Sequence, residues 1–178
     1  MIFVNKRRGF TVVELLIVIA IASLISSIAF ASIRTAREKS RDAKRVASIK
    51  QIQSALELYF NTNNSYPTGL YGIGATDGLT AGGHISSVPY DPSGTTVAYK
   101  YAYCTTPGRF YYHLGASLER QDNLSLNVDR DCNSATPNCA PGGCITYSSG
   151  FNGGSGPPEG IQKCDAAHAG NYCYDVIP

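Results

Sequence analysis

A stretch free of proline and glycine dominates the first third of this chain. It runs from Phe10 to Asn64, and the first helix-breaking residues after it are Pro67 and Gly69. Because proline and glycine disfavour a helix interior more than any other residues, the stretch predicts one continuous helix. A helix from Phe10 to Asn61 would be ~78 Å long. We expect its first half to lie in an apolar medium such as lipid and its second half to pack on a globular head.

The first half of this helix, residues 10–33, is suited to crossing a membrane. Its 24 residues include a single charge, Glu14, and about 20 apolar residues suffice to span a hydrocarbon core of ~30 Å. Three cations come directly before it: Lys6, Arg7 and Arg8. The alternative is an ordinary secretory signal peptide, cut after Ala22 or Ala31. A glutamate near the start of the apolar run disfavours that alternative, as does a helical pattern that continues past Ala31.

The second half of the helix, residues 34–64, changes character along its length. Residues 34–45 are rich in charge, with opposite charges spaced three and four apart, and predict a solvated helix face. An amphipathic stripe follows, with apolar residues spaced by three or four: Val46, Ile49, Ile52, Leu56, Tyr59 and Phe60. Such a stripe predicts the face that packs on the head.

Glu14 has a local role to consider at the start of the helix. Thr11-Val12-Val13-Glu14 fits the S/T-x-x-E capping box, in which the two side chains satisfy free amides of the first turn. A carboxylate at that point also meets the positive end of the helix dipole. Capping is therefore compatible with any further role of Glu14.

Residues 6–14 combine a basic segment with Gly9, Phe10, Thr11 and Glu14. This arrangement resembles the type III signal sequence of the type IV pilin and pseudopilin family. The resemblance implies that a leader, residues 1–9, is cut off after Gly9 by a prepilin peptidase, which also methylates the new N-terminal Phe10. It further implies that Glu14 guides the assembly of a helical filament. Lys6, Arg7 and Arg8 would be the leader charges.

The same resemblance implies the architecture and the partners. Residues 10–33 would form the transmembrane and filament-core helix, residues 34–64 its amphipathic continuation, and residues 65–178 a β-rich head. The fold would be α+β, with the long helix packed on a small antiparallel sheet. The precursor would lie in the bacterial inner membrane with its head outside, before joining a periplasmic or extracellular filament. The expected partners are the membrane, an inner-membrane assembly platform and further copies of the subunit in a helical homopolymer.

The head shows a pattern of its own after residue 88. The turn Asp91-Pro92-Ser93-Gly94 is followed by Val97, Tyr99, Tyr101 and Tyr103 in alternation, which predicts a half-buried strand. This part resembles the D-P-x-G turn and Tyr-rich strand of major pseudopilins of type II secretion. Residues 105–108 are expected to close a hairpin onto a second strand at 110–118. Further strands are possible near residues 145–147 and 172–174.

Six cysteines lie in the second half of the chain: Cys104, Cys132, Cys139, Cys144, Cys164 and Cys173. An even number in a loop-rich domain suggests disulfides formed in an oxidising compartment, although the sequence does not select among the pairings. The cations flanking residues 10–33 favour the opposite topology. The cysteines therefore decide the orientation, with the head outside.

Asp129 and Asp131 are the candidate metal ligands, and calcium is the candidate ion. Oxygen-bearing side chains alternate from Asp129, but Ser134 and Ala140 stand where an EF-hand needs Gly and Glu. Major pseudopilins commonly hold a calcium in a C-terminal loop, so the resemblance keeps calcium open. A polar turn is the simpler interpretation. We predict no other cofactor.

The sequence favours a structural role over catalysis. It contains no phosphate loop, no nucleophile elbow and no paired carboxylates in a catalytic context. The formal charge of +2 falls to −1 without the three leader cations, which gives no electrostatic case for binding nucleic acid. We expect a non-enzymatic subunit of a type IV pilus or pilus-like filament. The alternatives are a type II secretion pseudopilin, a DNA-uptake pilin, or a secreted or membrane-anchored binding domain.

Overall fold

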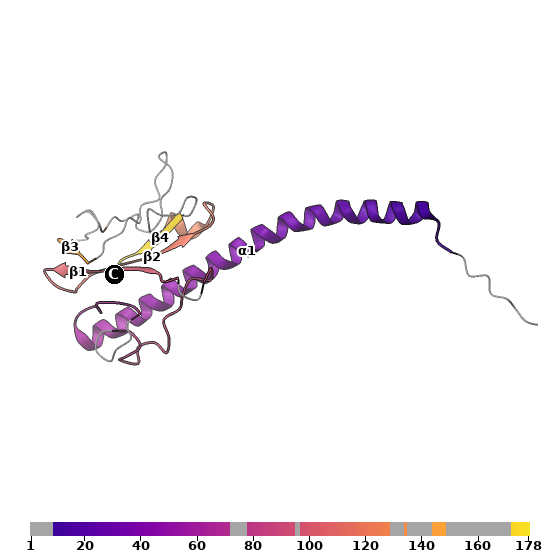
Figure 1. Cartoon of the computed structure of the whole chain (residues 1–178). Coiled ribbons are helices and arrows are strands. Elements are labelled where there is room, and N and C mark those ends of the chain that lie inside the picture. Colours follow the sequence, from indigo (N-terminus) through magenta and orange to yellow (C-terminus); the bar gives the residue numbers. More distant parts are fainter. Residues whose placement is uncertain (1–8, 72–77, 95–96, 129–133, 135–143, 149–171) are drawn as a thin grey trace, which may run out of the picture. The chain divides into compact units, whose positions relative to one another are not determined.

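The computed structural model describes residues 9–71, 78–94, 97–128, 134, 144–148 and 172–178. In chain order its elements are helix α1 (Val12–Asn63), strands β1 (Lys100–Thr106) and β2 (Tyr112–Leu118), the short 3-10 helix η1 (Leu124–Asn127), and strands β3 (Thr146–Tyr147) and β4 (Tyr172–Val176) (Figure 1). The chain divides into two compact units, Met1–Arg37 and Glu38–Pro178. A long helix followed by a small antiparallel sheet confirms the predicted α+β class.

Helix α1 is a single helix of 52 residues, as the absence of helix breakers predicted. It ends at Asn63, because Asn64 adopts a positive φ of 51°. The Asn64 N–H donates to the carbonyl of Phe60 at 2.8 Å, which satisfies one of the last free carbonyls of the helix. Asparagine tolerates this left-handed conformation better than most residues. Asn64 therefore ends the helix before Pro67 is reached.

In the first unit, α1 exposes the large apolar side chains whose placement the structure describes, residues 12–27 and Ile33. Leu15, Ile17 and Val18 each expose more than half of their surface. By length and composition, α1 is able to cross a membrane. An apolar surface of this extent needs lipid or another helix to cover it.

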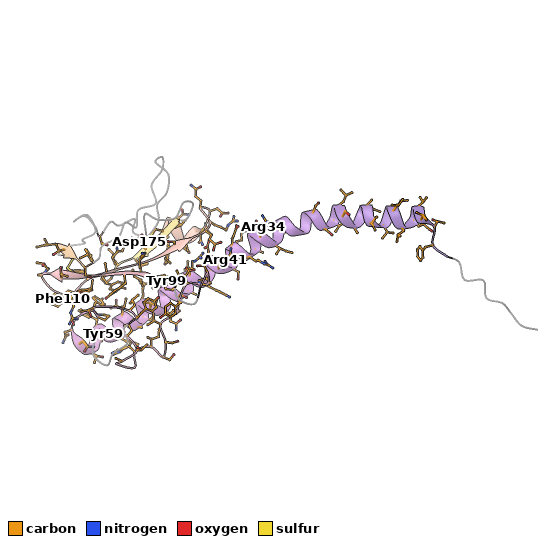
Figure 2. All side chains as sticks on the ribbon, viewed as in Figure 1. Arg34, Arg41, Tyr59, Tyr99, Phe110 and Asp175 are labelled. Atoms are coloured by element: carbon orange, nitrogen blue, oxygen red, sulfur yellow. A yellow bond between two sulfur atoms is a disulfide. The ribbon has the colours of Figure 1, made fainter. Side chains whose placement is uncertain are left out.

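In the second unit, the later half of α1 packs on one face of the sheet (Figure 2). The predicted stripe provides the helix side of this core, and Ile49, Ile52 and Leu56 are fully buried. Strand residues alternate between faces, so every second residue of β2 and β4 completes the core: Tyr112, Leu114, Ala116, Leu118 and Tyr174.

The sheet has the strand order β3-β1-β2-β4, and each described pair is antiparallel. Strands β1 and β2 form the predicted hairpin, with Tyr101 opposite Leu114, and the Thr106–Pro107 bond in it is cis. Strand β1 begins at Lys100, three residues later than the tyrosine alternation suggested. The carbonyl of Val97 instead accepts from the Asp91 N–H at 2.9 Å and closes the preceding loop. The further strands expected near residues 145–147 and 172–174 correspond to β3 and β4.

The face of the sheet that points away from α1 is buried as well. Ala102, Cys104 and Cys173 on this face are fully buried. A disulfide joins Cys104 of β1 to Cys144, two residues before β3. Strand β1 is thus half-buried as predicted, but its buried residues are Ala102 and Cys104, whereas Tyr101 and Tyr103 on the opposite face are only partly buried.

Candidate functional sites at the helix start and on the helix face

The residues of the predicted signal motif meet at the start of α1. The backbone N–H of Thr11 donates to Glu14 Oε2 at 2.9 Å, and the Thr11 hydroxyl donates to the same oxygen at 2.8 Å. The Glu14 N–H donates in turn to Thr11 Oγ1 at 3.2 Å. This is the reciprocal capping box that the sequence predicted. The carboxylate is thereby fixed one turn into the helix.

Gly9 and Phe10 precede this cap as exposed, non-helical residues. Phe10 exposes 86% of its surface. A methyl group built on Gly9 would meet nothing within 4 Å, so the chain's own packing does not require glycine there. An exposed, extended peptide bond is also what a protease needs to bind. Lys6, Arg7 and Arg8 lie outside the described residues.

A buried ionic cluster lies on α1 at the point where the sequence predicted a solvated face. Arg45 and Asp42 are 3% and 0% exposed, so that prediction was wrong for these two residues. The Arg45 guanidinium donates from Nε to Asp91 Oδ2 at 2.6 Å and from Nη2 to Asp91 Oδ1 at 3.0 Å. Its Nη1 donates to Asp42 and to Glu119, at 2.8 Å each. One guanidinium therefore joins three carboxylates from three parts of the chain.

Asp91 belongs to the Asp91-Pro92-Ser93-Gly94 turn, and the cluster explains why an aspartate stands there. Its Oδ1 accepts from the Ser93 N–H at 2.8 Å and from the Ser93 hydroxyl at 2.5 Å. Burial by itself would raise the pKa of Asp91, but the hydrogen bonds from Arg45 and Ser93 outweigh burial and hold the pKa below its usual value. The turn is thus folded around a carboxylate that faces the helix.

Asp42 and Glu119 connect the helix to the end of β2. The backbone N–H groups of Glu119 and Arg120 donate to the two carboxylate oxygens of Asp42, at 2.9 and 3.1 Å. The Glu119 side chain binds Arg41 in a two-point contact at 2.7 and 2.5 Å. The hydrogen bond from Arg41, assisted by Arg45, holds the pKa of Glu119 below its usual value although burial opposes this. The cluster therefore fixes α1 against both the 91–94 turn and β2.

A second buried polar group lies on the outer face of the sheet. His113 Nε2 lies 2.9 Å from Asp175 Oδ2, and its Nδ1 lies 2.7 Å from Ser134 Oγ. A serine, a histidine and an aspartate joined in this way by hydrogen bonds also form the catalytic triad of many hydrolases. However, His113 and Asp175 are fully buried and Ser134 is only 5% exposed, which is the burial of a structural polar group. The group instead holds β2, β4 and residue 134 together.

The remaining predicted site residues are described only in part. Among the described residues, no group of three His, Cys, Asp or Glu side chains is placed to hold a metal ion. Asp129 and Asp131 lie outside the described residues, so calcium stays a prediction. Cys173 is disulfide-bonded, as are Cys104 and Cys144. The other three cysteines lie outside the described part of the chain: Cys132, Cys139 and Cys164.

The buried cluster is what sequence reasoning missed, although a signal for it exists. Asp42 and Arg45 continue the spacing of the apolar stripe: Arg45 lies four residues before Ile49, and Asp42 lies three residues before Arg45. They lie on its buried face for that reason. Their charge indicated solvent, whereas their spacing indicated the core, and the spacing was the better guide.

Comparison with known proteins agrees with the motif at the helix start. The family model described as the prokaryotic N-terminal methylation motif matches residues 4–30. Type II secretion system core protein G of Aeromonas hydrophila is 34% identical over 102 residues, which cover 51% of this chain and 71% of that protein. The protein of the same name from Pectobacterium carotovorum subsp. carotovorum is 32% identical over 100 residues, covering 51% of this chain and 64% of its own length.

The match to Pseudomonas aeruginosa core protein G is longer and weaker. It is 26% identical over 123 residues, which cover 63% of this chain and 85% of that protein. No solved structure matches the chain. The chain thus combines an N-terminal methylation motif, a long apolar helix and a small antiparallel sheet with similarity to named secretion subunits. This chain belongs to the type IV pilin and type II secretion pseudopilin family.

Proposed function

We propose that this chain is the structural subunit of a pseudopilus-like filament, assembled through the first half of α1. The observation that carries the proposal is the methylation motif at residues 4–30, together with similarity to type II secretion core protein G. These relatives favour the pseudopilus over the type IV pilus, which was the first expectation from sequence. The subunit's part is mechanical, and we assign it no catalysis.

The helix start supports processing between Gly9 and Phe10. Both residues are exposed and precede the first turn of α1. The packing of the chain gives no reason for glycine at position 9, so we assign that requirement to a prepilin peptidase. Cleavage there would leave the capping box intact, because Thr11 and Glu14 both follow the cut.

Glu14 supports the assembly step. A carboxylate inside an apolar helix bundle is costly unless a cation pairs with it. Cleavage after Gly9 creates such a cation, the amino group of Phe10, on the same or on a neighbouring copy. The pairing would draw each new subunit to a defined depth, while the apolar side chains of residues 10–33 cover one another.

The first test is the N-terminus of the protein taken from its native membrane or from a sheared filament fraction. Mass spectrometry should find a chain that begins with N-methylated Phe10. A chain that begins after Ala22 or Ala31 would contradict the proposal, because signal peptidase would then have released the head. Surface labelling of intact cells separates the two filament types, since a pseudopilus is expected to remain in the periplasm.

The second test separates charge from capping at Glu14. Glu14→Gln keeps a side-chain acceptor for the Thr11 N–H and removes the charge. Thr11→Ala removes the hydroxyl that the Glu14 N–H donates to and keeps the charge. We expect Glu14→Gln to lose filaments and Thr11→Ala to retain them. Equal losses in the two variants would mean that Glu14 acts only as a helix cap.

A further inference from the structure

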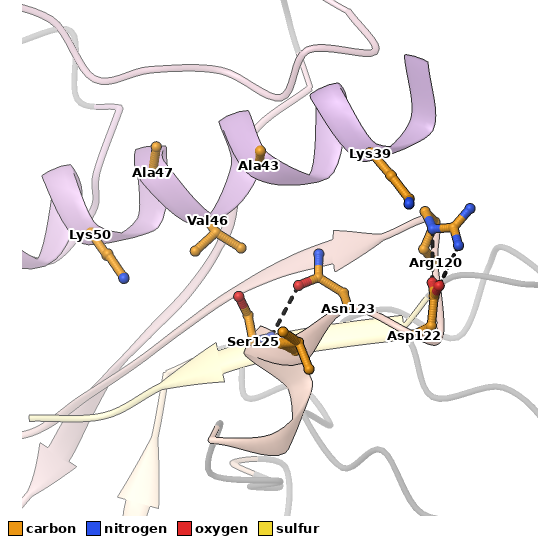
Figure 3. Close-up of a pocket in the computed structure, with 10 residues that line it drawn as sticks. Lys39, Ala43, Val46, Ala47, Lys50, Arg120, Asp122, Asn123 and Ser125 are labelled. Atoms are coloured by element: carbon orange, nitrogen blue, oxygen red, sulfur yellow. Dashed lines mark hydrogen bonds and ion pairs between the residues drawn. The ribbon is translucent and has the colours of Figure 1, made fainter. Parts of the chain in front are cut away.

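A groove of about 550 Å³ lies beside the later half of α1, between the helix and the segment that follows β2 (Figure 3). We call it the helix groove. One wall is the helix, with Lys39, Ala43, Val46, Ala47 and Lys50. The other wall is formed by Arg120 and the residues 122–125.

The helix groove combines an apolar centre with positive ends. Ala43, Ala47 and Leu124 supply apolar surface, and Leu124 is 79% exposed. Figure 3 shows Lys39 and Lys50 at opposite ends of the helix wall. Lys39 lies near Asp122, whereas Lys50 makes no ion pair with any described residue. The groove therefore suits an apolar side chain with a neighbouring carboxylate that reaches the Lys50 end.

The chain itself carries a segment of this chemistry further along α1. Leu58 is 53% exposed, although it lies on a helix whose neighbouring face is buried in the core. Glu57, directly before it, is also exposed. One oxygen of Glu57 accepts from the Tyr66 hydroxyl at 3.0 Å, and the other accepts no hydrogen bond from a described residue. Phe110, another exposed apolar side chain of the head, follows a cation, Arg109, and fits less well.

We propose that the helix groove of one copy binds Glu57 and Leu58 of a second copy. Leu58 packs against Ala43, Ala47 and Leu124, and the free Glu57 oxygen pairs with the Lys50 ammonium. The pair is half-sheltered by the groove, where an ion pair is screened less than on an open surface. This inference rests on the proposed filament function and adds a specific contact to it.

The two surfaces are offset along the same helix. Leu58 lies eleven residues after Ala47, about 16 Å along the axis. Copies that cross one membrane in the same direction hold their helices parallel, so two patches at different heights on the helix do not contact each other reciprocally in a two-fold dimer. The contact then repeats as an open helical array unless the rotation closes a ring. Each copy offers one groove and one Glu57–Leu58 segment. The contact therefore continues from copy to copy in the manner a filament requires.

Cysteine cross-linking between two differently tagged copies of the full chain tests the contact. One copy carries Ala47→Cys and the other Leu58→Cys, and both are made in the same membranes and oxidised. The two positions are ~16 Å apart on one helix, beyond the 4.4–6.8 Å that a disulfide spans, so a bond between them must join two copies. The control replaces Leu58→Cys by Phe110→Cys, which is another exposed apolar position.

We expect the mixed Ala47→Cys and Leu58→Cys pair to form cross-linked dimers about tenfold more efficiently than the control pair, because disulfide formation requires close approach. Equal yields with Phe110→Cys would overturn the contact. Dimers formed as readily by Ala47→Cys alone would also overturn it, because they would indicate a symmetric interface.

A charge exchange provides a second measurement that needs no new cysteine. Lys50→Glu should reduce the sedimentable filament fraction about tenfold or more, since close charge pairs at interfaces couple strongly. Lys50→Glu combined with Glu57→Lys should restore it. A double variant no better than the single one would contradict the pairing. If the unmodified chain forms filaments but neither test responds, only this contact is wrong. If it forms none, the proposed function fails and the contact fails with it.

Discussion

Removal of the Arg45 guanidinium should destabilise the head more than any other single charge change in the described cluster. Arg45 is the cation that contacts Asp42, Asp91 and Glu119 together, and its side chain is 4% exposed. Arg45→Met keeps much of the side-chain volume and leaves these carboxylates without their shared guanidinium. Breaking a buried ion pair by removing one partner costs about 3–5 kcal/mol. We expect a loss of that size in the free energy of unfolding at neutral pH.

Arg41→Met is the matched control, because it removes a guanidinium one turn earlier on the same helix. Arg41 binds only Glu119 among the carboxylates of the cluster, and its side chain is 36% exposed. Its removal should cost much less, because water replaces part of the lost interaction.

The assay is denaturant unfolding of the full chain in detergent, followed by tyrosine near-ultraviolet circular dichroism. The chain has twelve tyrosines and no tryptophan. Tyr59, Tyr66 and Tyr112 are buried in the head core, so this signal reports head packing even if detergent preserves helix.

Acidification provides an independent reading of the same variant. The unmodified head is expected to lose unfolding free energy on acidification. The Arg45→Met variant should instead recover part of its lost unfolding free energy, because the carboxylates that lost Arg45 become neutral. A variant as stable as the unmodified chain, or no worse than Arg41→Met, would refute the reasoning. The 91–94 turn would then be held by its own hydrogen bonds.

Three further predictions concern acid, the disulfide and the core. Folding lowers the pKa of Asp91, so the stabilisation that Asp91 contributes is complete above its unfolded pKa of about 4 and is lost as pH falls through the lower folded pKa. A pH series of unfolding curves should show this loss of stability, and the loss should be smaller in Asp91→Asn. Replacement of both Cys104 and Cys144 by serine opens a link between residues 40 apart and should lower the unfolding free energy by about 4 kcal/mol, measured by denaturant titration. Leu56→Ala, at a fully buried position, should cost about 2–5 kcal/mol, whereas Leu58→Ala should change monomer stability by less than about 0.5 kcal/mol.

Each of these predictions has an outcome that contradicts it. An unchanged acid response in Asp91→Asn would assign the acid sensitivity to other carboxylates. A double serine variant as stable as the unmodified chain would mean that the disulfide merely joins segments that pack without it. Equal losses for Leu56→Ala and Leu58→Ala would mean that Leu58 is buried within its own chain, which would also remove the basis for its role between copies.

The sequence predicts the helix and its core face well because both depend on local chemistry. A stretch without proline or glycine leaves the chain one regular option, and apolar residues three and four apart define the buried face. Alternation predicted the strands of the β1–β2 hairpin, although it did not reveal that Ala102 and Cys104, instead of the tyrosines, are the buried residues of β1. Cys104 is joined to Cys144, and spacing does not select the partner of a cysteine.

The ionic cluster required information that no local pattern contains. Asp42 and Arg45 have the spacing of core residues and the chemistry of surface residues. Their burial becomes favourable only when Asp91 and Glu119 arrive from distant parts of the chain, 46 and 74 residues after Arg45. The predicted roles of Gly9, Phe10 and Glu14 depend instead on a protease and on other copies of the chain. The structure fixes the geometry of the helix start, and those roles stay predictions.

The position of β4 beside β2 sets an order of events in folding. Side chains that contact each other across this pair, such as His113 and Asp175, are 62 residues apart in sequence. Helix α1 and the β1–β2 hairpin need only short-range contacts and form early, whereas β4 must close a long loop before it pairs. Until then, the outer edge of β2 has unpaired backbone groups, and another chain's strand can add to them. The head is therefore most exposed to mispairing after its helix and hairpin have formed and before β4 has docked.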